Sequence, residues 1–273
     1  METLNRIIDA VLLLFYRCFS WAPPVVGLTC LSIAAGAAML WIFGKTSNQQ
    51  RMKQVKRRVQ AGLLELRVFV DEPVISLRAQ RALLAANLNY LFLALRPALW
   101  MIVPVGLLLI HLEAFYDRAP LPLSQPALVT MGMTAGWDPS APPPVLIAPA
   151  NVAVMDPPVR VAAAREVSWR IVPWSPVSAE NLEFEFNGQQ VSKRLEAGSG
   201  QRYVPGRRVR SGWGMILSPG EGRIQSDFAE WIEIRYPDAG LRVFGFRVNW
   251  LVWFFVVSMV AALFLKKRFG VVI

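Results

Sequence analysis

Residue types that carry acid–base or metal chemistry are scarce in this chain of 273 residues. One histidine, His111, excludes a two-histidine metal site and leaves a histidine-based triad with a single poorly placed candidate. The two cysteines, Cys18 and Cys30, both precede the large polar segment, which therefore folds without disulfides. Gly44-Lys45-Thr46 resembles the end of a phosphate-binding loop, but Met39 stands where that motif requires a glycine. We therefore expect no enzyme, no cofactor and no metal.

The pair Arg96-Pro97 is the most informative polar feature, because it opens an apolar stretch. An arginine near membrane depth is costly unless it reaches water, headgroups or a partner. One interpretation is a hydrated, positively charged cavity that opens to the cytoplasm and receives polar parts of an inserting chain. The other is an arginine that snorkels to the inner interface. Asn87 and Asn89, one or two turns earlier, favour the first.

A second basic cluster lies far along the chain, in Arg202, Arg207, Arg208 and Arg210. Two roles are open for it: contact with lipid headgroups or an acidic partner outside the membrane, or a solvated surface, which is the commoner fate of clustered charges.

The composition places these residues in a membrane protein. Hydrophobic residues make up 54% of the chain and charged residues 18%, against about a quarter charged in a soluble domain. Three stretches lack any charge: Val25–Phe43, Pro97–Leu112 and Val248–Leu265. A membrane-spanning helix needs roughly 17–25 such residues. We predict transmembrane helices at 25–43, 96–112 and 248–265. The second stretch is short, so its helix has to include residues of the apolar segment before it.

The charges predict an orientation. The net charge is +10, and the excess lies in segment 44–96 and in the tail 266–273, whereas segment 113–247 is balanced. Because short loops rich in lysine and arginine stay cytoplasmic, we expect loop 44–95 and the tail inside a plasma membrane. The N-terminus and segment 113–247 are then outside. Orientation and attraction to anionic lipids account for the basic residues, so no nucleic-acid partner is expected.

The first two helical segments have different surfaces. Segment 1–24 is predicted to form an amphipathic helix in the outer interface, with Pro23-Pro24 ending it. A signal peptide is the alternative, which Asp9 disfavours by interrupting the apolar core. The span at 25–43 carries small residues at Ala34, Gly36 and Ala38, which allow close packing against another span of this chain or of a partner.

Segment 44–95 is predicted to be a cytoplasmic helical hairpin with arms at about 46–70 and 74–95, joined at Asp71-Glu72-Pro73. Short antiparallel arms of this kind pack as a coiled coil. The expected contact stripes are Met52, Val55, Val59, Leu63 and Leu66 on the first arm and Ile75, Leu77, Leu84, Leu88 and Leu91 on the second. A hairpin that merely spaces two spans is the alternative.

Segment 113–247 is predicted to be an outer β-rich domain, a sandwich of immunoglobulin type. Alternating residues predict strands at 167–171, 182–186, 189–195, 231–236 and 241–248. Asn187-Gly188 predicts a tight hairpin, and Pro237–Gly240 is expected to join the last two strands. The proline-rich part, Ala119–Pro158, is expected to form loops or edge strands.

The layout also carries a family resemblance. The predicted parts follow in the order outer amphipathic helix, span, basic hairpin and second span. The second span begins Arg96-Pro97-Ala-Leu-Trp and has Pro104 seven residues after Pro97. The last span starts Asn249-Trp-Leu-Val-Trp253 and ends Lys266-Lys-Arg268. Over about residues 3–112 and 248–270 this resembles the YidC/Oxa insertase superfamily, above all its three-span branch of archaeal YidC-like proteins and the insertase subunit of the ER membrane protein complex.

The resemblance implies a hydrophilic groove that is closed on the outer side and open to the cytoplasm. The hairpin would receive nascent membrane segments without ATP or cofactor. The basic residue of the family's groove has its nearest match in Arg96, with Arg51 as the other candidate.

Two functions from different classes therefore follow from the sequence. The first is a membrane protein insertase or chaperone that works within the bilayer on nascent membrane proteins. The second is a non-catalytic subunit of a larger membrane complex, which binds a partner through its outer β-domain. A transporter is disfavoured, because spans so poor in carboxylates and histidines offer no ion path.

Overall fold

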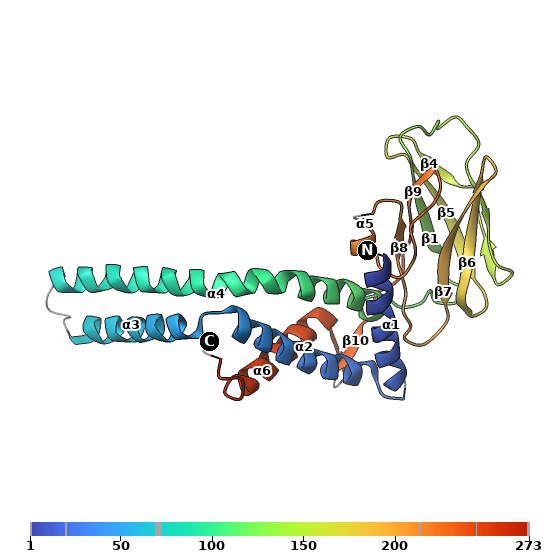
Figure 1. Ribbon diagram of the computed structural model, residues 1–273. Helices are drawn as coiled ribbons and strands as arrows, with labels where there is room; N and C mark the ends of the chain where they lie inside the picture. Colours follow the sequence, from blue (N-terminus) through green and yellow to red (C-terminus); the bar gives the residue numbers. More distant parts are fainter. Residues whose placement is uncertain (1, 20, 69–72, 213, 244, 272–273) are drawn as a thin grey trace. The chain divides into compact units, whose positions relative to one another are not determined.

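The computed structural model describes residues 2–19, 21–68, 73–212, 214–243 and 245–271, and they divide into two compact units (Figure 1). The first unit comprises Met1–Gly27 and Leu107–Trp250, and the second comprises Leu28–Gly106 and Leu251–Ile273. The first contains a β-domain with the N-terminal helix and the end of a long helix. The second contains the helices that carry most of the apolar surface.

Five helices make up the α-helical framework: α1 Glu2–Cys18, α2 Pro24–Thr46, α3 Gln49–Val68, α4 Pro73–Tyr116 and α6 Trp250–Leu265. Pro24 occupies the first position of α2, where its missing N–H costs nothing. Asn48 caps α3, since its Oδ1 accepts a hydrogen bond from the Arg51 backbone N–H at 3.0 Å. In α1, which occupies the predicted amphipathic segment, Asn5, Leu12 and Tyr16 are buried and share one side.

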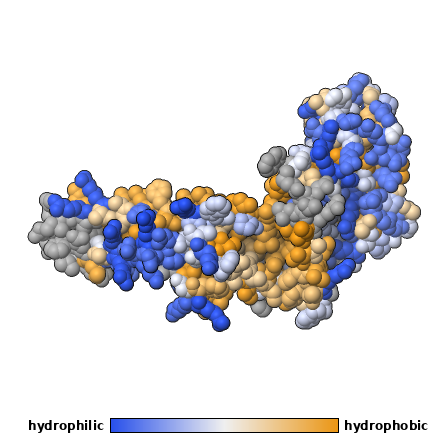
Figure 2. Space-filling model, viewed as in Figure 1, coloured by the Kyte–Doolittle hydropathy of each residue, from blue (hydrophilic) through white to orange (hydrophobic). Residues whose placement is uncertain are grey.

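Among the described residues, two helices are long and apolar enough to cross a membrane: α2, and the Gln80–Tyr116 part of α4. Figure 2 shows hydrophobic and hydrophilic residues mixed on the hairpin, hydrophobic ones over most of the remaining helical part, and hydrophilic ones over most of the β-domain. Helix α6 is apolar throughout but has only 16 residues. At 1.5 Å per residue it spans about 24 Å, less than the roughly 30 Å of a bilayer core.

The second predicted hairpin arm and the second predicted span belong to the same helix. The structure has one continuous helix of 44 residues, Pro73–Tyr116, with Pro97 and Pro104 inside it. A proline removes only one helical hydrogen bond, and long apolar flanks on both sides keep the helix in register. Of the predicted turn, Asp71 and Glu72 lie outside the described residues, and Pro73 is the first residue of α4.

The β-domain consists of two antiparallel sheets and a separate hairpin. The larger sheet has the order β3-β5-β1-β9-β8, with β4 also paired to β5, and the smaller one has the order β2-β6-β7. The larger-sheet strands are β1 Ala127–Met133, β3 Val152–Val154, β4 Val159–Val161, β5 Glu166–Pro173, β8 Arg207–Val209 and β9 Ala229–Ile234. The others are β2 Val145–Ile147, β6 Val177–Phe186, β7 Gln189–Ala197, β10 Leu241–Val243 and β11 Phe246–Val248, and a short helix α5, Gly214–Leu217, follows β8.

One hydrophobic core lies between the two sheets. Alternate residues of β1 and β5, such as Met131 and Trp169, point into it, as do Phe184 and Leu195 of the smaller sheet. The rings of Trp169 and Phe184 meet edge to face, with centroids 5.1 Å apart. The predicted β-rich domain of sandwich architecture is therefore confirmed, without any disulfide.

Three predicted strands and their turn are confirmed. Segments 167–171, 182–186 and 189–195 lie within β5, β6 and β7. The turn between β6 and β7 has positive φ at both Asn187 (50°) and Gly188 (74°), as a two-residue hairpin of primed type requires.

Two strand predictions are wrong. Segment Ala119–Pro158 was expected to form only loops or edges, but β1 runs through the centre of the larger sheet, between β5 and β9. Its own alternation, with Val129, Met131 and Met133 buried, outweighs the prolines around it. Segment 241–248 is not one strand: it folds back on itself as β10 and β11, because Gly245 adopts φ 88° between them. It does not pair with β9 in the described residues.

Candidate functional site

The helical hairpin packs along a seam of heptad spacing. Gly62 of α3 lies against Leu83 of α4, where an added Cβ would come within 3.5 Å of Leu83 Cδ1. The less exposed residues of each helix recur at intervals of three and four residues, as in an antiparallel coiled coil. They are Met52, Val55, Val59 and Gly62 on α3, and Leu83, Ala86, Tyr90, Leu93 and Pro97 on α4.

The predicted seam on α4 was out of register. Leu77, Leu84, Leu88 and Leu91 were expected to contact the first arm, but they are exposed, as is Leu63 of α3. The side chains of Leu66 and Ile75 lie outside the described side chains. Leucine content drew the prediction to Leu84, Leu88 and Leu91, whereas the close approach at Gly62 selects the neighbouring stripe that includes Ala86.

The consequence is an apolar surface on the hairpin that the rest of the described chain leaves open. Leu84, Leu88, Leu91 and Phe92 form it, and Phe92 is 68% exposed. We call these four residues the α4 stripe. A contiguous apolar surface of this kind marks a binding site for lipid or for another chain. Sequence reasoning assigned the leucines to the hairpin itself and so missed the surface.

The predicted groove residues lie beside this stripe. Asn87 and Asn89 are exposed on α4 among its leucines, and Arg96 is exposed one turn further on. Arg51 is exposed at the start of α3. Since the helices run antiparallel from the contact at Gly62, the beginning of α3 and the Arg96 region of α4 lie at the same end of the hairpin. No acidic side chain pairs with Arg96 or Arg51 within 4.0 Å among the described residues.

Pro97 belongs to the seam, whereas Arg96 points away from it. Pro97 is buried, and Arg96 next to it is exposed. Because proline has no N–H, the carbonyl of Leu93 loses its helical donor here, and the carbonyl of Trp100 loses its donor at Pro104. A free carbonyl within an apolar helix gives polar groups of another molecule a place to bind.

Helices α2 and α6 contact each other through Gly36. An added Cβ at Gly36 would lie 2.5 Å from the Ser258 carbonyl oxygen, so only glycine permits this approach. The indole N–H of Trp253 donates to Thr29 Oγ1 at 3.0 Å, in the same pair of helices. Ala34 and Ala38, the other small residues that were predicted to mediate packing, are exposed on α2.

A polar cluster fixes α1 to the β-domain. The Tyr203 hydroxyl donates to Asp9 Oδ1 at 2.9 Å, and His111 Nε2 lies 3.7 Å from the same oxygen. Burial raises the pKa of the Asp9 carboxyl above its ordinary value, although Tyr203 and His111 act in the opposite direction. His111 Nδ1 lies 2.7 Å from the Leu107 carbonyl oxygen, which leaves Nε2 to face Asp9.

The four predicted outer arginines have different surroundings. Arg208 is turned inward and donates to the backbone carbonyls of Ser192 and Gly222. Arg202 donates to the Val177 carbonyl oxygen at 3.2 Å and lies 3.6 Å from Glu196. Arg207 and Arg210 instead line a surface pocket.

No family model, curated protein or solved structure matches this chain. Within the described residues, no group of three or more histidine, cysteine, aspartate or glutamate side chains could hold a metal ion. The surfaces with the clearest functional content are therefore the α4 stripe with its polar neighbours, and the pocket beside β8.

Proposed function

We propose that this chain is a YidC-like membrane protein insertase or chaperone, which receives nascent membrane segments on the hairpin and passes them into the bilayer beside Arg96. The observation that carries the proposal is the exposed α4 stripe. It offers apolar side chains to an entering helix, with Asn89 and Arg96 as polar contacts on one side of the stripe and Asn87 on the other. The stripe lies at the beginning of the Gln80–Tyr116 part of α4, which is long and apolar enough to cross a membrane, and the helix continues from it without interruption to Tyr116.

The proposal includes a topology. Helices α2, α4 and α6 serve as three spans, with α6 completed by residues beyond each of its ends. The hairpin and the basic tail face the cytoplasm of a cell bounded by the plasma membrane, and the β-domain lies outside. The basic residues of the hairpin support this orientation, since short basic loops remain inside. The immunoglobulin type of the β-sandwich stays a prediction.

The second candidate is a non-catalytic subunit of a larger membrane complex. The exposed small residues Ala34 and Ala38 on α2 favour it, because they allow a helix of another chain to approach closely. In that case the α4 stripe binds one fixed partner instead of many transient clients. The β-domain, at about 130 residues, would supply a further contact outside.

Photocrosslinking in living cells separates the two. A photoreactive amino acid at Asn89 should give a smear of many newly made membrane proteins that disappears when translation is blocked. The matched control is Tyr90, which is adjacent in sequence but faces the seam and should crosslink only within the chain. A single discrete band from Asn89, insensitive to translation, would reject the insertase and support the fixed partner.

Substitution of Arg96 tests the polar part of the surface. Arg96→Glu should reduce insertion of a client with a short translocated tail several-fold at equal protein abundance, because it replaces the positive charge with a negative one. Arg57→Glu, an exposed position on α3 outside the stripe, makes the same charge change and should have little effect. Equal insertion by both variants and the parent would count against the proposal.

A further inference from the structure

A pocket of about 590 Å³ opens on the β-domain next to α5, outside every surface used above. Its size lies in the range of small-molecule sites, roughly 300–1,000 Å³. Its lining combines three guanidinium groups with one indole ring and two hydroxyl groups. These residues are Arg207, Arg210, Arg223, Trp231, Ser211 and Ser218.

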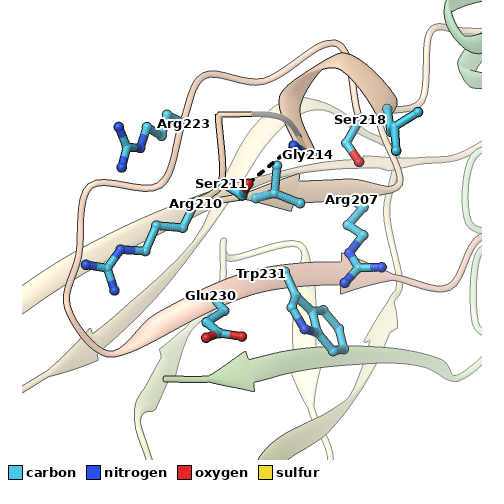
Figure 3. Close-up of a pocket in the computed structure, with 10 residues that line it drawn as sticks. Arg207, Arg210, Ser211, Gly214, Ser218, Arg223, Glu230 and Trp231 are labelled. Atoms are coloured by element: carbon cyan, nitrogen blue, oxygen red, sulfur yellow. Dashed lines mark hydrogen bonds between the residues drawn. The ribbon is translucent and has the colours of Figure 1, made fainter. Parts of the chain in front are cut away.

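The three arginines come from both sides of the pocket (Figure 3). Arg207 lies over the Trp231 ring, with its guanidinium carbon 4.3 Å from the ring centroid, and so forms one wall. Figure 3 shows Arg210 and Arg223 at the other side, with their guanidinium groups apart from each other and both directed away from Trp231. Guanidinium groups match the oxygens of a phosphate in geometry as well as in charge.

The charge of the pocket is only weakly compensated. Arg210 lies 3.4 Å from Asp227, whose side chain is 84% exposed, and exposed pairs of this kind contribute little. Arg223 is exposed and has no acidic partner within 4.0 Å in the described part of the chain. Arg207 lies 4.0 Å from Glu233, in a second exposed pair outside the lining. Glu230 is the one acid in the lining itself, which therefore carries three positive charges and one negative charge. The pocket therefore favours an anion over a neutral or zwitterionic ligand.

The apolar border of the pocket indicates which kind of molecule carries the anionic group. Leu217 of α5 lines the pocket and is 70% exposed. The same short helix is held to α1, since the Asn5 amide donates to the Met215 carbonyl oxygen at 2.8 Å. On α1, the side opposite Asn5 exposes Ile7, Val11 and Leu14. An apolar face of this kind lies in a membrane interface, and the pocket is attached directly to the helix that bears it.

We infer that this pocket binds the phosphate headgroup of an anionic phospholipid in the leaflet on which α1 lies. Arg210 and Arg223 contact the phosphate oxygens, and Leu217 contacts the start of the acyl chains. Glu230 and the two serines are placed to bind the hydroxyl groups of a glycerol headgroup. The inference does not depend on insertase activity, because none of its residues belongs to the hairpin.

Native mass spectrometry of the full chain in detergent tests this inference. Titration with phosphatidylglycerol should show one lipid bound at the lowest concentrations, and phosphatidylethanolamine should bind more weakly. Arg223→Glu and Arg210→Gln should each weaken that binding by about tenfold, as expected for loss of a charge-assisted hydrogen bond. Arg235→Glu, an exposed arginine of the same domain outside the pocket, is the control and should bind like the parent.

Three results would overturn the inference. Equal weakening by Arg235→Glu would mean that only the net charge matters, and equal binding of phosphatidylethanolamine would remove the preference for an anion. Saturation by water-soluble glycerol phosphate at the concentration that suffices for the lipid would indicate a soluble ligand instead. Leu217→Ser sharpens this last distinction, because it should weaken lipid binding and leave glycerol phosphate binding unchanged. Unaltered melting of each variant without lipid establishes that the pocket is still folded.

Discussion

The β-domain and the helices differ in whether they provide partners for side chains that are unfavourable when left alone, that is, for buried charges and exposed apolar groups. In the β-domain the fully buried Lys193 has partners from the domain itself: its ammonium group donates to Glu221 and to the Pro205 carbonyl oxygen. Glu196, also buried, is paired with Arg194. On the helices, by contrast, apolar residues such as Leu88 and Phe92 are exposed and nothing in the described chain covers them.

The difference indicates where function lies. Buried charges that pair with groups of the same domain serve the stability of that domain. Ligand sites of the β-domain are therefore expected at its surface. The exposed apolar residues of the helices are of the kind that lipid or another chain covers. The experiments below test this contrast, beginning with the one that should have the largest effect.

Removing the ammonium group of Lys193 should destabilise the β-domain most. Burial lowers the pKa of Lys193, while the Glu221 carboxylate acts to hold it charged. Lys193→Ala leaves Glu221 poorly solvated without its cation, and breaking such a buried pair costs about 3–5 kcal/mol. We expect rapid proteolysis of the β-domain at temperatures where the parent chain resists it.

The double variant Lys193→Met with Glu221→Gln is the control for that experiment. It removes both charges and keeps the volume, so it should recover most of the lost resistance. If the single variant resists protease as well as the parent does, the domain does not depend on its buried pair and the contrast with the helices fails.

Widening the contact between α2 and α6 should have an intermediate effect. At Gly36 an added Cβ meets backbone atoms of Ser258, which cannot rotate away, whereas at Gly106 of α4 nothing lies within 4 Å. Gly36→Val should therefore cost about 1–3 kcal/mol through overpacking, and Gly106→Val should cost much less. Thermal unfolding in detergent compares them; equal melting temperatures would show that the two helices do not depend on this contact.

Substitutions of two neighbouring leucines on α4 distinguish the seam from the open surface. Leu83 faces Gly62 of α3, and Leu84 is 63% exposed. Leu83→Asp should speed hydrogen exchange in α3 because it places a charge in the seam, at a cost of about 1–3 kcal/mol. Leu84→Asp should change stability by less than about 0.5 kcal/mol.

The same pair of variants also reports on function. Leu84→Asp should still reduce crosslinking from Asn89, because it adds a charge to the α4 stripe. A Leu84→Asp variant that loosens α3 as much as Leu83→Asp does would place Leu84 in the seam, as the sequence alone suggested.

The sequence was informative wherever one local pattern dominates. Uncharged runs located α2 and the apolar half of α4, and Asn187-Gly188 located a hairpin turn. The sequence was misleading where a close contact between distant segments determines which residues are buried. The seam follows Gly62 and Leu83 rather than Leu84, Leu88 and Leu91, and β1 is central despite the prolines around it. Arg223 was not identified as a site residue, because only the fold brings it beside Arg210.

The smallest expected effect concerns Asp9, which lies on the side of α1 that faces the β-domain and contacts Tyr203 there. Its raised pKa means that the docked helix binds this proton more tightly than the undocked one, whose carboxyl titrates near the ordinary value of 3.8. Docking should therefore be strongest at low pH and weaken as the pH rises from about 4 through the raised pKa. The change should be small, because the Tyr203 hydroxyl and His111 offset part of the burial cost. Asp9→Asn keeps an oxygen acceptor for Tyr203 and should abolish this pH dependence of hydrogen exchange in α1, after correction for intrinsic rates. A variant that retains the parent's pH profile would assign the dependence to another group.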